Sequence, residues 1–269
     1  MNFNLKARSV ALAAAVVLGG SALASQASAA TVVFGNITGS WSAATPGGAA
    51  SYSGNGTDNA KVKWGTPTSW FGPKSGYTFS ANSPVNAVLP GVGDYGPFTI
   101  GTFTHNNWPI TGSSISSIKL TIATEIIIDG LSQGVHTFQY LFNHWETDND
   151  VPGKNGVCAN GQKESASINK NGCADRVKVN YLDTSSTFNV GGYVYTLDFA
   201  GFQDDGASVT EFWTKEKKDN SAQFLANIKL VGPLSSPVPE PATWAMMIIG
   251  FGAVGAVVRG SRRRVSLAA

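Results

Sequence analysis

The sequence predicts an all-β protein whose main domain is a β-sandwich of jelly-roll type. Three observations support this fold class. Apolar and polar residues alternate with a period of two in several runs, which is the pattern of half-buried strands. Clusters of Gly, Asn, Asp and Pro, such as GNGTDN and GVGDYGP, separate these runs and are typical of turns. No long segment of the domain shows helical periodicity.

The alternation is clearest in residues 117–129, where every second residue from Ile118 to Ile128 is predicted to face the core. Residues 136–146 show the same pattern on an aromatic face. The remaining predicted strands are residues 176–181, 191–202 and 222–231. Residues 208–220 are ambiguous, and both a short helical turn and a loop are compatible with them.

The N-terminal end, residues 1–29, is predicted to be a cleavable signal peptide. Lys6 and Arg8 give it a positive start, and a short apolar region follows at residues 11–24. Ala27-Ser28-Ala29 then fits the small-x-small rule of signal peptidase. An uncleaved anchor helix fits less well, because the apolar region is short and ends in small residues.

The C-terminal end predicts one membrane-spanning helix followed by positive charge. Residues 242–258 form a run of 17 residues whose only polar side chain is Thr243. A spanning helix needs roughly 20 apolar residues, with about 17 as the lower limit. The arginines that follow are Arg259, Arg262, Arg263 and Arg264. Positive charge beside a span stays cytoplasmic, so the main domain is predicted to lie outside the membrane and the C-terminus in the cytoplasm.

Pro239-Glu240-Pro241 precedes this span, and the arginines close it. The three-part tail, residues 239–264, resembles the PEP-CTERM sorting signal of Gram-negative bacteria. The resemblance implies that an exosortase, a membrane-embedded cysteine protease, processes the chain at Pro239, Glu240 and Pro241. It also implies an exported protein that is first held in the inner membrane and then placed at the outer surface or secreted. An ordinary C-terminal membrane anchor is the alternative.

The domain organisation follows from these two ends. We expect a signal peptide at 1–29, an exported β-sandwich domain at 30–232, a linker at 233–238, the sorting signal at 239–264 and a short cytoplasmic tail at 265–269. Six of the 19 basic residues lie in the two ends, which leaves 13 basic and 16 acidic residues in 31–239. This balance gives no basic face of the kind that nucleic-acid binding needs, so no nucleic-acid partner is expected.

Cys158 and Cys173 are the two cysteines of the chain. Export places them in an oxidising compartment, where disulfides form and persist. A bridge between them would close a 16-residue loop and stabilise the fold by about 3 kcal/mol. Zinc binding by this pair is not expected, because no histidine lies nearby to complete a site.

Several short motifs occur in a fixed order along the domain. They are VKWGTP at 62–67, FTIGTFTHNNWPI at 98–110, the ET of HWETDND, and the pair GVCANG and GCADRV. Together they resemble the choice-of-anchor K domain, a family of bacterial surface or secreted domains carried on alternative C-terminal anchors. The resemblance spans about residues 58–230. It implies export, β structure and the disulfide, and it carries no catalytic residues with it.

An acidic loop follows the aromatic strand and contains Glu146, Asp148 and Asp150. Asp175 lies just after Cys173, so a disulfide that folds the loop back would bring these oxygens together. Hard oxygen ligands in a loop suit Ca²⁺. The spacing differs from that of an EF-hand. Solvated turn residues with local hydrogen bonds are the simpler interpretation, and both interpretations stay open.

Other polar residues suggest chemistry less strongly. Asp204 and Asp205, with Glu211 nearby, could supply the two carboxylates of a glycoside hydrolase, but Asp-Asp-Gly is also a common turn sequence. His105 could act as a ligand or a base, but the favoured expectation is that it hydrogen-bonds loop backbone and holds the turn before Pro109. His136 and His144 lie on the aromatic strand face and are expected to be core or rim histidines.

Tryptophans are frequent in the domain, and three aromatic residues are candidates for glycan contact: Trp70, Phe71 and Trp108. Aromatic rings stack well on sugar faces, and the Gly/Pro-rich surroundings of Trp70 and Phe71 predict that this pair is exposed. Packing in the core or in loops explains most tryptophans equally well, so this alternative stays open.

We therefore expect a non-catalytic exported protein of the cell surface or extracellular matrix, associated with exopolysaccharide or biofilm. No cofactor is expected beyond a structural Ca²⁺ at the acidic loop. The alternatives are a secreted hydrolase acting on polysaccharide and a Ca²⁺-dependent carbohydrate-binding adhesin. The expected partners are exosortase, signal peptidase, exopolysaccharide and the membrane, which the C-terminal helix contacts transiently.

Overall fold

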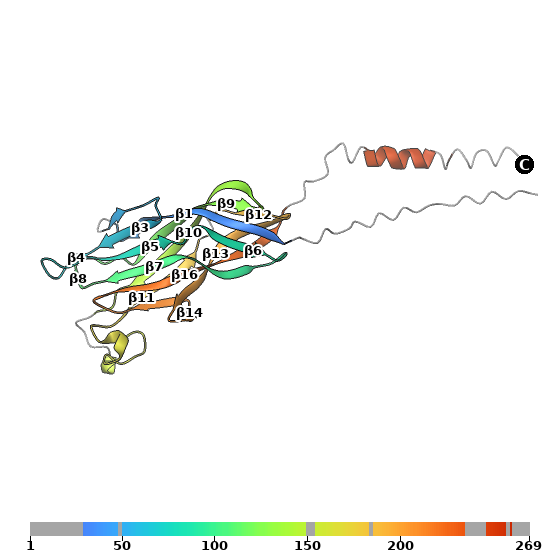
Figure 1. Ribbon diagram of the computed structural model, residues 1–269. Coiled ribbons are helices and arrows are strands. Elements are labelled where there is room, and N and C mark those ends of the chain that lie inside the picture. Colours follow the sequence, from blue (N-terminus) through green and yellow to red (C-terminus); the bar gives the residue numbers. More distant parts are fainter. Residues whose placement is uncertain are drawn as a thin grey trace, which may run out of the picture.

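Two antiparallel sheets pack face to face around one core and make up the folded domain (Figure 1). The computed structural model describes residues 29–47, 50–148, 154–182, 185–234, 246–256 and 259. Most of these residues lie in strands, which confirms the all-β prediction. The predicted signal peptide lies outside the described residues except for Ala29, and the jelly-roll type stays a prediction.

The first sheet has six strands and the second has eight. The first contains, in spatial order, β15 (Glu211–Thr214), β11 (Asp175–Tyr181), β10 (Leu131–Trp145), β9 (Ser117–Ile128), β1 (Ala30–Thr45) and β6 (Val85–Leu89). The second contains β12 (Phe188–Val190), β13 (Tyr193–Asp204), β16 (Lys218–Pro233), β7 (Tyr95–Asn107), β5 (Ser75–Ala81), β3 (Asn59–Trp64) and β2 (Ser51–Ser53), with β14 (Ala207–Val209) paired to β13.

Smaller elements lie at the end of the sandwich. β4 (Thr66–Pro67) and β8 (Ile110–Thr111) form a separate two-stranded ribbon. Two short 3₁₀ turns, η1 (Lys154–Gly156) and η2 (Ser167–Asn169), lie in the segment that joins β10 to β11.

The alternation predicted for residues 117–129 is confirmed in β9. Every second side chain from Ile118 to Ile126 is buried, and the intervening ones are partly exposed. Leu120 lies opposite Trp41 of β1 on one side and Tyr140 of β10 on the other. Directly opposed residues on one face pack side by side, so β9 forms the centre of the first sheet.

The other predicted strands are also confirmed. Residues 136–146 correspond to β10, 176–181 to β11, 191–202 to β13 and 222–231 to the greater part of β16. The ambiguous segment 208–220 is mostly strand, because it contains β15 and the start of β16. Phe212 and Thr214 of β15 are buried and pair with β11, and this tertiary pairing decides the local structure.

A register shift in β13 changes which of its residues face the core. Tyr195 and Leu197 are buried as the alternation predicts, but the pairing with β16 shifts between Phe199 and Gly201. Beyond this shift Phe202 is fully buried. Gly201 has a φ of +131°, a conformation that other residues rarely adopt. Before the bulge, the odd-numbered Tyr195 and Leu197 face the core. After it, the even-numbered Phe202 does.

Aromatic rings fill the space between the sheets. Phe142 of β10 contacts Trp41 of β1 and Phe103 of β7, with ring centroids 5.0 and 5.1 Å apart. The Trp41 indole Nε1 donates a buried hydrogen bond of 3.1 Å to the Ala60 carbonyl oxygen of β3, in the opposite sheet. Burial of large rings dominates core energetics, so this contact fixes how the sheets face each other.

Both ends of the domain leave the same end of the sandwich. β1 begins and β16 ends beside β6 and β12, whereas β4 and β8 lie at the opposite end (Figure 1). Phe34, near the start of β1, contacts Phe188 of β12, and Leu234 donates its backbone N–H to the Gly192 carbonyl. Features near β4 and β8 are therefore remote from the chain ends.

In the sorting tail the structure describes a short helix at residues 246–256. Among the described residues, no helix has both the length and the hydropathy that crossing a membrane requires. Both ends of the predicted span 242–258 lie outside the described residues, so this span stays a prediction.

Leu120→Ala should lower the free energy of unfolding by about 2–5 kcal/mol, because it leaves a cavity between the sheets. Urea denaturation of the exported chain, followed by tryptophan fluorescence, measures the loss. Lys119→Ala is the matched control on the solvent side of the same strand, and it should change stability by less than about 0.5 kcal/mol. Equal losses in both variants would contradict this assignment of faces.

Candidate functional site

Five ionisable side chains converge at the β4–β8 end of the sandwich. These are His105 of β7, His144 of β10, Asp175 at the start of β11, and Glu146 and Glu216 in the adjoining connections. All are buried except Glu146, whose side chain is 26% exposed. We call this group the His–carboxylate cluster. It lies between the sheets, because β7 belongs to one and β10 and β11 to the other.

The strand period places both histidines inside. His105 lies two residues after the buried Phe103 on β7, and His144 lies two residues after the buried Phe142 on β10. On each strand the core position before the histidine is thus aromatic, and the next one is an imidazole. The prediction that His144 is a core histidine is confirmed, and His136 is partly buried near Phe188.

His105 does not hold the turn before Pro109, so that expectation was wrong. Its Nδ1 lies 2.8 Å from the Thr214 hydroxyl, and this hydroxyl donates its hydrogen to the Asp175 carbonyl oxygen at 3.3 Å. A hydroxyl has a single hydrogen, so when Thr214 donates to Asp175, Nδ1 of His105 is the donor to Thr214 and Nε2 carries a lone pair. Among the described residues, Nε2 has no hydrogen-bond partner. Burial, with a smaller effect from His144, lowers the pKa of His105 well below its ordinary value.

His144 is held from both sides. Its Nδ1 lies 2.7 Å from the Tyr77 hydroxyl, and its Nε2 lies 3.1 Å from Oε2 of Glu146. The Ser114 hydroxyl donates to the same carboxylate oxygen at 2.8 Å. Burial, followed by the negative charges of Asp175 and Glu146, raises the pKa of Tyr77 well above its ordinary value, so the phenol stays protonated at neutral pH.

Asp175 belongs to two sets of converging ligand atoms, one with His105 and His144 and the other with Glu146 and Glu216. Its Oδ1 accepts a hydrogen bond of 2.7 Å from the Thr147 backbone N–H, and the Thr147 hydroxyl oxygen lies 3.1 Å from it. Its Oδ2 is buried and has no hydrogen-bond partner among the described residues. Burial raises the pKa of Asp175 well above its ordinary value, and the charges of Glu146 and Glu216 raise it further, against the opposing hydrogen bonds of Thr147.

The predicted disulfide is confirmed and lies beside the cluster. Cys158 and Cys173 are joined, with their Cα atoms 5.5 Å apart. The Cys173 carbonyl accepts a 2.6 Å hydrogen bond from the Thr147 hydroxyl, and Asn171 donates to the Glu216 carbonyl at 3.1 Å. The bridge therefore fixes the segment that leads directly into Asp175.

The structure brings together only part of the predicted calcium set. Glu146 and Asp175 converge, but their third partner is Glu216, with ligand atoms within 4.8 Å of one another. Asp148 belongs to neither converging group, and Asp150 lies outside the described residues. Sequence reasoning missed Glu216, because it lies in the charged run KEKK, which is typical of a solvated turn. The signal for the two histidines was that each lies two residues after an aromatic residue of the same strand, on the same face.

The exposure predicted for Trp70 and Phe71 is confirmed. Their side chains are 92% and 94% exposed, at the tip of the loop that joins β4 to β5. The base of this loop and Trp108 border a groove lined by Thr68, Ser69, Gly72, Pro73, Trp108, Pro109 and Lys217. The Trp108 indole donates to Oδ1 of Asp219 at 3.1 Å, which fixes the ring beside the groove.

A second hollow lies on the other side of Trp108, on the outer face of the second sheet. It is lined by Lys61, Lys63, Pro73, Lys74, Thr78, Asn106, Trp108 and Asp219. Three of these residues are lysines and one is an acid. We call Trp70, Phe71 and Trp108 the aromatic surface. Lysines of β3 and of the loop before β5 border it at Trp108.

The remaining tryptophans have other environments. Trp64 is fully buried and stacks on His105, with ring centroids 6.0 Å apart. Trp145 and Trp213 lie on the outer face of the first sheet on either side of Arg176, whose guanidinium carbon is 4.8 Å from the Trp145 ring centroid. Core packing thus explains Trp64, and stacking on arginine explains the other two.

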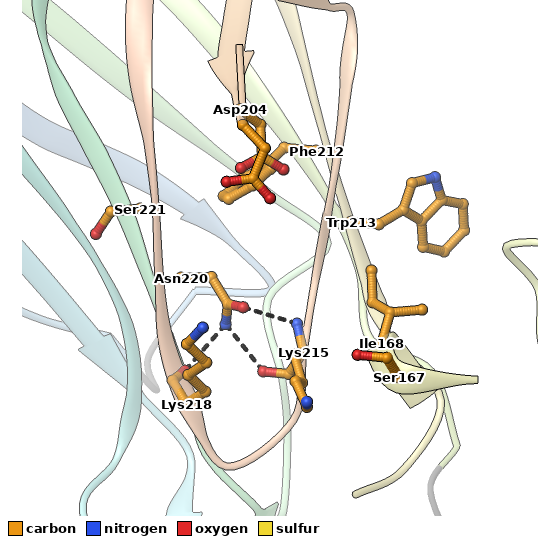
Figure 2. Close-up of a pocket in the computed structure, with 10 residues that line it drawn as sticks. Ser167, Ile168, Asp204, Phe212, Trp213, Lys215, Lys218, Asn220 and Ser221 are labelled. Atoms are coloured by element: carbon orange, nitrogen blue, oxygen red, sulfur yellow. Dashed lines mark hydrogen bonds between the residues drawn. The ribbon is translucent and has the colours of Figure 1, made fainter. Parts of the chain in front are cut away.

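A polar hollow contains Asp204 and Asp205 (Figure 2). Figure 2 shows Asp204 across this hollow from Lys215, Lys218 and Asn220. Asp205 and Gly206 have φ values of +45° and +83°, as a two-residue type I′ hairpin turn requires. Burial, followed by the charge of Asp205, raises the pKa of Asp204. Glu211 lies elsewhere, 3.7 Å from both Arg176 and Lys178, so the three carboxylates do not converge.

The comparison with known families concerns the tail. Residues 237–264 match the PEP-CTERM protein-sorting motif. A search of curated proteins finds no matching relative. The motif marks the chain as an exported protein that an exosortase recognises, and that is anchored in a membrane before it is processed. Pro239, Glu240 and Pro241 lie within the match and outside the described residues.

Replacing both Cys158 and Cys173 with serine should lower the free energy of unfolding by about 3 kcal/mol, because the unfolded chain regains the entropy of a loop of 15 residues' separation. Urea denaturation of the exported chain measures this. Ser165→Ala, an exposed position in the same loop, is the control and should change little. Unchanged stability in the double variant would show that the bridge does not constrain the fold.

Proposed function

We propose that this chain is a non-catalytic surface protein of a Gram-negative bacterium that binds exopolysaccharide in the extracellular matrix or biofilm. The observation that carries the proposal is the exposed pair Trp70 and Phe71 beside the Trp108 groove, on a chain that bears an exosortase sorting motif. Exosortase sorting places the domain outside the cell, where polysaccharide is the abundant ligand for such a surface.

The finer steps of export belong to this proposal. Signal peptidase removes residues 1–29, the apolar span holds the chain in the inner membrane, and the arginines keep the C-terminus cytoplasmic. Exosortase then acts at Pro239, Glu240 and Pro241. The choice-of-anchor K resemblance and the jelly-roll type fit a domain of this class.

The aromatic surface supports glycan binding by its shape and by its exposure. Two large rings held almost fully in water at a loop tip make no contribution to the core, and their exposure costs free energy. Trp108 is fixed by its hydrogen bond to Asp219 and supplies a third ring. Sugar faces pack on rings of this kind, and hydroxyls along the groove can hydrogen-bond to Thr68 and Ser69.

The lysines around Trp108 favour an acidic polysaccharide. Lys61, Lys63 and Lys74 line the outer hollow, and Lys217 lines the groove. Clustered positive charge attracts an anionic chain and weakens with added salt. We therefore expect binding to uronate-containing exopolysaccharide to decrease as the ionic strength rises.

The hydrolase alternative uses Asp204 and Asp205. Both carboxylates lie at one hairpin turn and face lysines, whereas glycoside hydrolysis uses two carboxylates on opposite sides of the scissile bond. This arrangement favours the non-catalytic class. The adhesin alternative differs in requiring Ca²⁺, so chelation separates it from the proposal.

Deleting residues 239–264 should release the domain from the membrane fraction, because it removes both the span and the sorting motif. Fractionation and immunoblotting of the expressing bacterium measure the distribution. Deletion of residues 265–269 is the control and should leave the chain with the membrane. A membrane-bound product of the first deletion would refute anchoring by the tail.

Replacing Trp70 and Phe71 with alanine should weaken binding to exopolysaccharide at least tenfold. Burying one such side chain contributes about 1.5–3 kcal/mol, and about 1.4 kcal/mol corresponds to a factor of ten. Co-sedimentation of the exported chain with purified exopolysaccharide, with Ca²⁺ and with EDTA, measures affinity. Trp145→Ala is the matched control on the other sheet and should bind normally.

Three outcomes would contradict the proposal. Undiminished binding by the double variant would show that Trp70 and Phe71 do not contribute to polysaccharide binding. Binding by the unmodified chain that occurs with Ca²⁺ and disappears in EDTA would favour the Ca²⁺-dependent adhesin. Release of new reducing ends, abolished by Asp204→Asn, would establish a hydrolase.

A further inference from the structure

The His–carboxylate cluster contains two buried acceptor atoms that receive no hydrogen. With Nδ1 of His105 as the donor to the Thr214 hydroxyl, its Nε2 carries a lone pair, and Oδ2 belongs to the Asp175 carboxyl group. Among the described residues, neither has a hydrogen-bond partner. Both residues are fully buried. An unmade hydrogen bond on a buried polar atom is destabilising, so two such atoms in one cluster call for a shared ligand.

A shared proton does not explain the arrangement. If Asp175 donated a hydrogen to His105, the two atoms would lie at hydrogen-bond distance, and no such bond joins these residues. Among the described residues, no lysine or arginine forms an ion pair with Asp175. Converging nitrogen and oxygen acceptors are satisfied by a water molecule that donates to both or by a cation. The three carboxyl groups gathered here favour the cation.

The distances fit one metal ion. One ligand atom from each of His105, His144 and Asp175 lies within 4.8 Å of the others. The same limit holds for Glu146, Asp175 and Glu216, so Asp175 is common to both groups. Imidazole nitrogens and carboxylate oxygens bind zinc at about 2.0–2.2 Å, which leaves ligand atoms about 3–4 Å from one another. Small side-chain movements bring the cluster within that range.

We propose that His105, His144 and Asp175 bind one divalent transition-metal ion, whose coordination the carboxylates of Glu146 and Glu216 complete. Imidazole ligands favour zinc and the neighbouring transition metals, whereas Ca²⁺ is bound by oxygen atoms. The site thus shares Glu146 and Asp175 with the calcium set expected from the sequence, but its other ligands and its metal are different.

Each of the three central ligands has an outer hydrogen-bond partner, as metal ligands usually do. Thr214 bonds Nδ1 of His105, Tyr77 bonds Nδ1 of His144, and Thr147 bonds Oδ1 of Asp175. These contacts leave Nε2 of His105 and Oδ2 of Asp175 for the metal. For His144, metal binding moves the ring hydrogen to Nδ1, so that Nε2 becomes the ligand and Tyr77 the acceptor.

The ion would join the two sheets and the disulfide-bonded segment at one point. His105 belongs to the second sheet, His144 and Asp175 to the first, and Asp175 follows Cys173 by two residues. The role is structural and independent of glycan binding, because the cluster is buried while Trp70 and Phe71 are exposed.

The test uses the untagged full chain, exported with its disulfide, purified in detergent and stripped with EDTA. Isothermal titration with Zn²⁺, Mn²⁺ and Ca²⁺ measures affinity, and elemental analysis measures the metal content. We expect one Zn²⁺ per chain and a rise in melting temperature. His105→Gln and Asp175→Asn should each weaken Zn²⁺ binding more than about 100-fold, beyond the 10- to 100-fold effect of removing an outer partner.

Asp175→Asn keeps the Oδ1 acceptor for Thr147 and removes a buried charge, so its metal-free form should remain folded. Asp58→Asn, an exposed turn position, is the control and should bind normally. Zn²⁺ binding that both cluster variants retain would overturn the proposal, and so would binding of Ca²⁺ alone. Absence of any metal binding would overturn it as well and would identify the cluster as a hydrated polar pocket.

Discussion

Contact between the two sheets depends on a band of aromatic rings that crosses the core. Phe142 of the first sheet lies against Phe103 and Phe224 of the second, with centroids 5.1 and 6.1 Å apart. Rings of this size each bury about 150–250 Å², so they set the separation of the sheets as well as their affinity. The indole of Trp41 adds direction through its hydrogen bond to Ala60. The positions of the cluster and of the groove follow from that separation.

The His–carboxylate cluster continues this band, with ionisable side chains in place of apolar rings. Because strand side chains alternate, the residues two positions beyond Phe103 and Phe142 also enter the core, and they are His105 and His144. Their polar atoms cannot be left without partners there, so hydroxyl and carboxyl groups gather around them. The partners come from strands, such as Tyr77 of β5 and Thr214 of β15, and from connections at the end of the sandwich, one of which the disulfide fixes. Along β7 and β10, the core residues thus change from apolar rings to ionisable side chains.

Local patterns predicted some parts of this structure well. Strict alternation identified β9, and composition around Trp70 predicted its exposure. Other parts depend on contacts that a local pattern does not contain. Phe202 is buried because a bulge at Gly201 reverses the parity of β13, and Glu216 enters the cluster because β15 pairs with β11. The calcium set was predicted from one acidic loop together with Asp175, whereas the structure gathers the ionisable side chains from several strands and connections.

The two ends of the domain leave the sandwich side by side, and this arrangement makes the domain a spacer. β16 has 16 residues and extends about 50 Å at roughly 3.3 Å per residue. It starts beside Trp108 and ends where the chain continues toward the sorting motif. While the tail holds the chain, the aromatic tip lies at the end of the domain that is remote from the tail. Cleavage of the tail then changes where the protein resides and leaves the distal surface as it was.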